Sequence, residues 1–223
     1  MDKQLFKEAI AKVSAGIVLM ALLLFLPAGT VRYPGGWRLM TVLFIPMVIA
    51  GFVMMAKNPE LLRRRLDARE KESEQKTVVA LSGVMFLAGF IAAGLDFRFG
   101  WSQMPGWATA TGTVLFLLSY LLYAEVLREN AYLSRTIKVQ ENQKVVDTGL
   151  YGVVRHPMYA ATIVLFLSMP LVLGSLVCFV IFLVYPILIA KRIRNEEEVL
   201  ERELTGYKEY KQRIRWRVIP FLW

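Results

Sequence analysis

The stretch that decides the fold is PMYAATIVLFLSMPLVLGSLVCFVIFLVYPILIA, residues 157–190, in which no side chain is charged. At about 1.5 Å per residue, one straight helix of this length would be roughly 51 Å long, well beyond the ~30 Å hydrocarbon core of a bilayer. Pro170 and Gly174 lie near the middle of the stretch, where a helix is expected to break. We therefore predict a hairpin of two short membrane spans.

Four more stretches without charge precede this hairpin, at residues 13–31, 39–56, 77–95 and 99–124. Each is long enough to cross the bilayer, so the sequence predicts an all-α integral membrane protein with about six transmembrane helices, the last two a helical hairpin, plus a cytosolic C-terminal helix. The first stretch follows lysines, as the apolar part of a signal peptide does, but its length favours a retained helix.

The positive charges predict the orientation of these spans. All but three of the 27 Lys and Arg fall before the first span or in segments 57–76, 128–155 and 191–217. The exceptions are Arg32, Arg38 and Arg98. The positive-inside rule places the basic segments and both termini in the cytoplasm. The net charge of +9 then favours anionic membrane lipids as partners, and it requires no nucleic acid.

The residue inventory excludes several kinds of site. With one cysteine and one histidine, the chain has neither an internal disulfide nor the side chains of the common zinc sites. It also has no dinucleotide fingerprint G-x-G-x-x-G, no P-loop and no G-x-S-x-G nucleophile motif. We therefore expect no metal site.

The segment TGLYGVVRHPMYA, residues 148–160, leads into the hairpin and holds the one histidine, His156. Pro157 suits the first turn of a helix, so Arg155 and His156 should lie at a helix N-terminus, where free N–H groups favour an anionic group. Tyr159, three residues after His156, can face the same cavity. The alternative is that His156 and the tyrosines only anchor the helix at the membrane interface.

A second polar segment, RIRNEEEVLERELTGYKEY, residues 192–210, follows the hairpin. Arg192 and Glu196 are four residues apart, so they share a helix face and form either an exposed ion pair or part of a site. In a site, the carboxylate can accept from a ribose or an amino group. The arginine can hold a substrate carboxylate or phosphate.

Together, these two motifs and the hairpin between them resemble the isoprenylcysteine carboxyl methyltransferase family, with its phospholipid methyltransferase relatives. The resemblance covers residues 57–220 and is strongest from Gln140 onward. It implies a membrane enzyme that binds S-adenosylmethionine (SAM) in a cytosolic pocket. It also implies a lipid-like or prenylated acceptor that arrives laterally through the membrane and is methylated on a carboxylate or an amine.

The resemblance also implies the site residues. The cofactor contacts would be Gln140, Val145, Val146, Tyr151, His156, Pro157, Met158, Tyr159, Glu196 and Glu197. Arg192 matches the arginine that faces the substrate, and we expect it to be catalytic. If the register of the three glutamates shifts by one, Glu197 or Glu198 takes the role of Glu196. Lys144 stands where some family members have histidine, so its contact with the cofactor is not implied.

By the same resemblance, residues 1–223 form one membrane methyltransferase domain. Residues 1–56 would be an N-terminal helical pair. Residues 57–223 would be the catalytic core, with its cofactor pocket built from 128–160 and 191–217.

Two other functions compete with this one. Membrane sterol reductases that use NADPH carry a similar R-H-x-x-Y element, but they typically place an acidic residue soon after the tyrosine, whereas Ala160 and Ala161 follow Tyr159 here. A lipid-binding membrane protein without enzymatic activity would explain the basic cytoplasmic segments but not the two motifs together.

Overall fold

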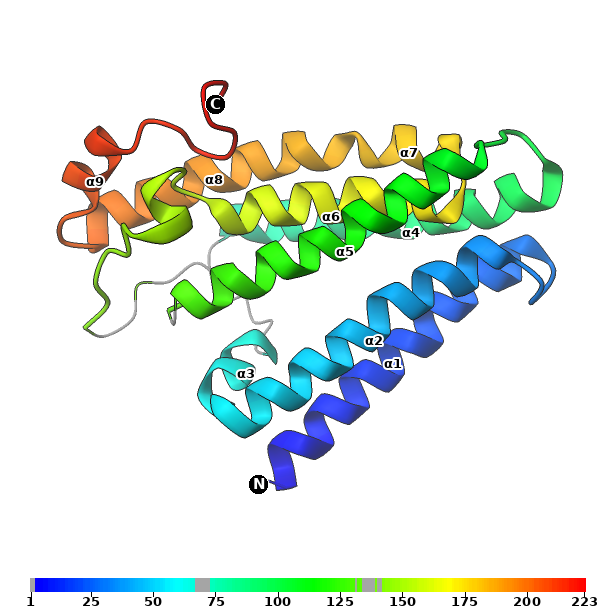
Figure 1. Ribbon diagram of the computed structural model, residues 1–223, viewed down its shortest axis with the longest axis horizontal. Coiled ribbons are helices and arrows are strands. Elements are labelled where there is room, and N and C mark those ends of the chain that lie inside the picture. Colours follow the sequence, from blue (N-terminus) through cyan, green and yellow to red (C-terminus); the bar gives the residue numbers. More distant parts are fainter. Residues whose placement is uncertain (1–2, 67–72, 131, 134–138, 140–141) are drawn as a thin grey trace.

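The computed structural model describes residues 3–66, 73–130, 132–133, 139 and 142–223 (Figure 1). Its helices are α1 (Lys3–Ala28), α2 (Pro34–Lys57), α3 (Pro59–Leu66), α4 (Ser73–Phe99), α5 (Gly106–Glu129), a 3-10 turn (Gly149–Gly152), α6 (Pro157–Leu173), α7 (Leu176–Phe182), α8 (Val184–Glu203) and α9 (Tyr207–Arg213). The described residues contain no strand, so the predicted all-α class is confirmed.

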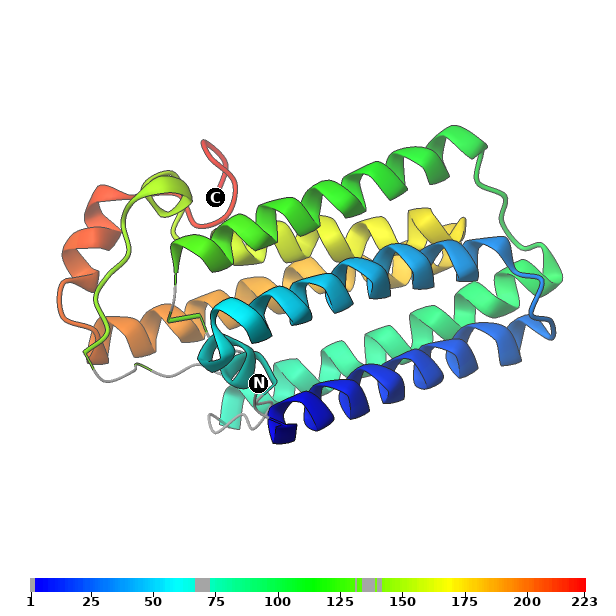
Figure 2. The ribbon, with the colours of Figure 1, turned by 60° about the horizontal axis from the view of Figure 1, so that its bottom comes forward.

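The long helices have the length and composition of membrane spans. Five stretches within the described residues are long and apolar enough to cross a bilayer: α1, α2, α5, most of α4, and α7 together with α8. The shorter apolar helix α6, with 17 residues, lies among them and pairs with α5 (Figures 1 and 2). The protein is therefore an integral membrane protein with about six crossings, as the sequence predicted.

The predicted hairpin is present, and its break lies at one of the two expected residues. Gly174 ends α6 with a φ of +78°, and Ser175 begins the next helix by accepting a hydrogen bond from the Cys178 N–H at 3.1 Å. Pro170, in contrast, stays inside α6. The second arm is longer than expected, because α8 continues without a break from the apolar stretch into the charged segment as far as Glu203, and a separate helix, α9, begins only at Tyr207.

Small residues allow the helices to approach closely within the membrane. A Cβ on Gly94 of α4 would lie 2.6 Å from the Leu24 carbonyl oxygen of α1. A Cβ on Gly112 of α5 would overlap the Leu171 side chain of α6. Such contacts are typical of membrane helices, whose association depends on close van der Waals packing because lipid is as apolar as the helix surface.

A buried polar cluster joins two turns at the end of the bundle far from α9. Asp96, 2% exposed near the end of α4, accepts hydrogen bonds from the Ser102 N–H at 2.7 Å and the Ser102 hydroxyl at 2.6 Å. The Ser175 hydroxyl also donates to this carboxylate. The α4–α5 connection is thereby tied to the turn of the hairpin, which fixes α6 against α8.

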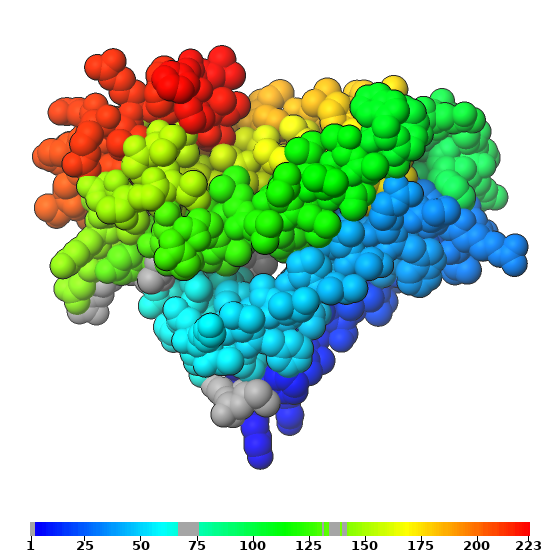
Figure 3. All heavy atoms as spheres, in the orientation of Figure 1, coloured from blue at the N-terminus to red at the C-terminus, as the bar shows by residue number. Residues whose placement is uncertain are grey.

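The opposite end of the bundle carries most of the polar structure. Both ribbon views place the N-terminus, α3, the end of α8, α9 and the C-terminal segment toward this end (Figures 1 and 2). In the space-filling view, the orange and red C-terminal residues lie directly against the yellow-green segment that precedes α6 (Figure 3). The two predicted site segments are therefore neighbours.

Candidate functional site

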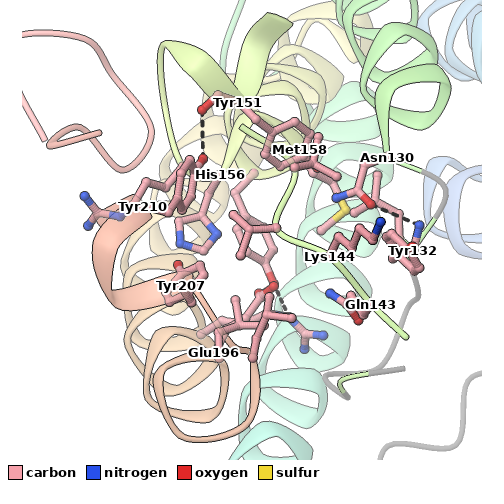
Figure 4. A pocket seen from close by; sticks show the side chains of 18 residues that line it. Asn130, Tyr132, Gln143, Lys144, Tyr151, His156, Met158, Glu196, Tyr207 and Tyr210 are labelled. Atoms are coloured by element: carbon pink, nitrogen blue, oxygen red, sulfur yellow. Dashed lines mark hydrogen bonds between the residues drawn. The ribbon is translucent and has the colours of Figure 1, made fainter. Parts of the chain in front are cut away.

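A pocket opens where the connector after α5 meets the start of α6, the end of α8 and α9 (Figure 4). Its walls contain eight of the residues that the sequence singled out: Val145, Val146, Tyr151, His156, Met158, Tyr159, Arg192 and Glu196. Lys144 also lines it. Gln140 lies outside the described residues. Pro157 and Glu197 are not among the lining residues. The functional role of each residue stays a prediction.

The start of α6 is held by the chain's last segment. Pro157 is the first helical residue, as predicted, and His156 precedes it with extended φ. The Arg155 N–H donates to the Trp216 carbonyl at 2.9 Å, and the His156 N–H donates to the Arg217 carbonyl at 2.8 Å. These two N–H groups are therefore occupied by the chain itself, and neither is free to bind an anion.

The Tyr159 hydroxyl joins the two charged residues expected to carry the chemistry. It accepts a hydrogen bond from Arg192 Nε at 2.9 Å and donates to Glu196 Oε2 at 2.5 Å. Because Arg192 and Glu196 are one turn apart on α8, the hydroxyl bridges them from the facing helix α6. This geometry places a cation and a carboxylate side by side at the boundary between the membrane and the polar end of the bundle.

The neighbouring glutamates have different environments, which settles which of them faces the pocket. Glu197, 2% exposed, accepts from Arg155 Nε at 2.7 Å and from Arg217 Nε at 3.0 Å, and its Oε1 lies 3.2 Å from His156 Nε2. Glu198 is exposed. Glu196 therefore faces the pocket, whereas Glu197 lies in a buried ion-pair cluster beside it.

The same ion-pair cluster fixes the C-terminal segment. Arg155 Nη1 donates to the carbonyls of Ile214 and Arg215 at 2.6 and 2.8 Å. One guanidinium thus binds both the carboxylate on α8 and the backbone after α9. As a result, the R-H-P motif, α8 and residues 214–217 form one unit behind the pocket wall.

The turn before α6 positions Tyr151 in the pocket. The Glu129 carboxylate at the end of α5 accepts from the Leu150 N–H at 2.9 Å, and a Cβ on Gly149 would collide with this carboxylate. Gly149 also has a φ of +53°, which favours glycine. The Tyr210 hydroxyl donates to the Tyr151 carbonyl at 2.8 Å. Burial raises the pKa of both phenols above the usual range, so they stay neutral.

Several pocket residues were not singled out from the sequence. They are Asn130, Tyr132, Leu133, Gln143, Leu200, Leu204, Tyr207 and Tyr210. The G-Y-K-E-Y pattern at residues 206–210 carried a usable signal, because tyrosines three residues apart share a helix face. The described residues contain no group of three or more potential metal ligands.

The pocket offers complementary groups for a polar molecule with a cationic part. Glu196 supplies acceptors, Arg192 supplies donors, and the tyrosine hydroxyls supply both. Val145, Val146 and Met158 add apolar surface. The pocket therefore combines charged, hydrogen-bonding and apolar surface.

Comparisons with known proteins agree with this architecture. The model of the isoprenylcysteine carboxyl methyltransferase (ICMT) family matches residues 110–202. A structure of the eukaryotic intramembrane Ras methyltransferase ICMT superimposes with a TM-score of 0.58 at 19% identity, over 96% of this chain and 76% of that one. At this identity, the superposition shows a shared fold.

Two protein sequences are also similar. A Delta(14)-sterol reductase of Mus musculus, TM7SF2, is 29% identical over 91 residues, which make up 40% of this chain but only 22% of the reductase. YpbQ of Bacillus subtilis (strain 168), an uncharacterized protein, is 23% identical over 166 residues, which cover 74% of this chain and 96% of YpbQ. The family match and the fold confirm the resemblance seen in the motifs: residues 110–202 match the model of the isoprenylcysteine carboxyl methyltransferase family, and the chain shares the fold of one of its members.

Proposed function

We propose that this protein is a SAM-dependent methyltransferase that acts on a lipid-like or prenylated acceptor at the cytoplasmic face of the membrane. The observation that carries the proposal is the bridge from Arg192 through the Tyr159 hydroxyl to Glu196. A cation and a carboxylate within one helical turn support paired roles toward an anionic acceptor and a polar cofactor, and residues 110–202 of the chain match a methyltransferase family.

The pocket residues fit such a cofactor by the chemistry of their donors and acceptors. Glu196 accepts from hydroxyl or amino groups, and the buried hydroxyl of Tyr207, which has no partner among the described residues, is available to a ligand. Bound SAM would supply a methyl group already activated by a sulfonium. The residues would bind the cofactor, orient the acceptor and exclude water.

Arg192 would hold the acceptor's carboxylate or phosphate through charge-assisted hydrogen bonds. A bound cation also makes a carboxylate a weaker nucleophile. Arg192 would therefore promote the reaction by orienting the acceptor in line with the methyl group. The Tyr159 hydroxyl would keep the guanidinium in place. Because Arg192 lies closer to the membrane than Glu196 on α8, the acceptor would approach from the lipid side and the cofactor from the aqueous side.

Calorimetry on the purified protein in detergent tests the proposal. We expect SAM to bind and NADPH not to bind. The sterol reductase similarity makes NADPH the informative competitor, so binding of NADPH without SAM would instead support a reductase. Binding of neither cofactor would contradict both enzymes and favour a lipid-binding protein.

The orientation in the membrane gives a separate prediction. We expect both termini in the cytoplasm, because the basic segments gather at the end of the bundle that carries α3 and α9. Reporter fusions at the N-terminus and C-terminus should both report a cytoplasmic location, and a third fusion in the 100–105 loop should report the opposite side. Termini on different sides would contradict the even number of crossings.

A further inference from the structure

Tyr207 lines the pocket, and its hydroxyl group lacks a hydrogen-bond partner in the described part of the chain. The residue is 4% exposed, and its hydroxyl oxygen is buried. A buried hydroxyl without a partner is costly, because it loses its hydrogen bonds to water and gains none in return. Such an atom in a pocket wall requires an explanation.

The other tyrosines of the pocket differ from Tyr207 in this respect. The Tyr210 hydroxyl donates to the Tyr151 carbonyl at 2.8 Å, and the Tyr159 hydroxyl contacts both Arg192 and Glu196. The Tyr132 hydroxyl donates to the Asn142 carbonyl at 3.3 Å. Among the buried side-chain oxygens of the described residues, only the Tyr207 hydroxyl lacks a hydrogen-bond partner.

The surroundings of Tyr207 keep its hydroxyl protonated and fixed. Burial, together with the nearby carboxylates of Glu197 and Glu196, raises the pKa of this phenol far above its usual range. Its ring packs against Tyr210 with centroids 5.7 Å apart, at the start of α9. Figure 4 shows it beside His156 on the wall that also carries Glu196. The result is a rigid, neutral hydroxyl next to a carboxylate.

We propose that the Tyr207 hydroxyl is a further cofactor-recognition group, which hydrogen-bonds to the ribose diol of the bound nucleoside cofactor. Glu196 offers only acceptors, whereas a tyrosine hydroxyl donates and accepts. A diol matches this pair, because one of its hydroxyls can donate to the carboxylate while the other accepts from Tyr207. The inference rests on the proposed function, since it assumes a nucleoside in the pocket.

The test is Tyr207→Phe, which removes one oxygen, with S-adenosylhomocysteine and 5′-methylthioadenosine as calorimetric probes on the full chain. Both probes carry the ribose diol, and only the first carries the amino acid. We expect the affinity for both to fall by a similar factor, on the order of 10-fold. The thermal midpoint of the ligand-free variant should not decrease, because no internal hydrogen bond is lost.

Two matched variants control for other causes. Tyr210→Phe removes the bond to the Tyr151 carbonyl and should lower the ligand-free thermal midpoint. Tyr120→Phe, whose hydroxyl donates to the Leu43 carbonyl at 2.8 Å outside the pocket, should leave affinity unchanged.

Three results would overturn the inference. Unchanged affinity of Tyr207→Phe for both probes would remove Tyr207 from the site. A loss for S-adenosylhomocysteine alone would place the contact on the amino-acid part and refute the ribose assignment. If the parent protein bound neither probe nor SAM, the proposed function would also be wrong. If the parent bound them and only the Tyr207 result failed, the proposed function would stand without this contact.

Discussion

Replacing Glu197 with Gln should lower the free energy of unfolding by about 3–5 kcal/mol, the cost of leaving a buried charge without its partner. The side chains of Arg155 and Glu197 are only 4% and 2% exposed, so water cannot replace the lost interaction. Arg217 also loses its carboxylate partner in this variant. Because Arg155 holds the carbonyls of Ile214 and Arg215, the C-terminal segment should loosen together with the start of α6.

Thermal and denaturant unfolding in detergent would measure this loss. Glu198→Gln is the matched control, because it makes the same chemical change at the exposed neighbouring position. The control should shift stability by less than about 0.5 kcal/mol. Equal effects of the two substitutions would show that the ion-pair cluster does not stabilise the fold.

Removing Arg192 or Glu196 should affect activity in two different ways. Arg192→Ala should spare SAM binding and reduce turnover or acceptor affinity by roughly 10- to 150-fold, which corresponds to the ~1.5–3 kcal/mol of a charge-assisted contact. Glu196→Gln should raise the apparent KM for SAM. If the two residues formed only an exposed ion pair, losing about 0.3–0.5 kcal/mol would hardly change activity.

Calorimetry with SAM and methyl-transfer kinetics on both variants distinguish these outcomes. Arg194→Ala and Glu198→Gln are suitable controls, because both residues are exposed on the same helix. If both variants bound SAM and turned over like the parent, Arg192 and Glu196 would have no role in the site and would only form part of a solvated helix face. Equal loss of SAM binding would assign Arg192 to the cofactor and contradict its proposed contact with the acceptor.

The membrane spans were predictable because a charged side chain in the hydrocarbon core costs much free energy, so stretches without charge mark the spans. Residues 157–190 predicted the hairpin and a break near Pro170 and Gly174, and the helix ends at Gly174, since a glycine at positive φ ends a helix at low cost. The meeting of the R-H-P segment with α8 also followed, because the hairpin returns the chain to the same end of the bundle. The continuous extension of α8 was missed, since charge ends a membrane span but does not end a helix.

The environment of each glutamate could not be predicted from the residues alone, because adjacent residues on a helix can have the same chemistry and still point in different directions. Glu196, Glu197 and Glu198 are identical in the sequence, and only the packing of α8 gives them pocket, buried and exposed positions. Arg155 was expected at a helix start, but its partners at residues 214–217 are about 60 positions away. The sequence gives no sign that the Tyr207 hydroxyl lacks a partner, because the presence of a partner depends on which residues surround it in the fold.

Because α8 is one unbroken helix, the number of residues between Leu183 and Arg192 determines which way Arg192 and Glu196 face. One residue inserted between Leu183 and Arg192 would rotate every later side chain by about 100° and turn Arg192 and Glu196 away from Tyr159. Four inserted residues would nearly restore the direction but would move both side chains about 6 Å further from the bilayer. Adaptation to a membrane of different thickness is therefore confined to the other end of the span. There, Leu183 keeps helical dihedral angles between α7 and α8, so a change in length would be taken up at the hairpin turn of Gly174 and Ser175.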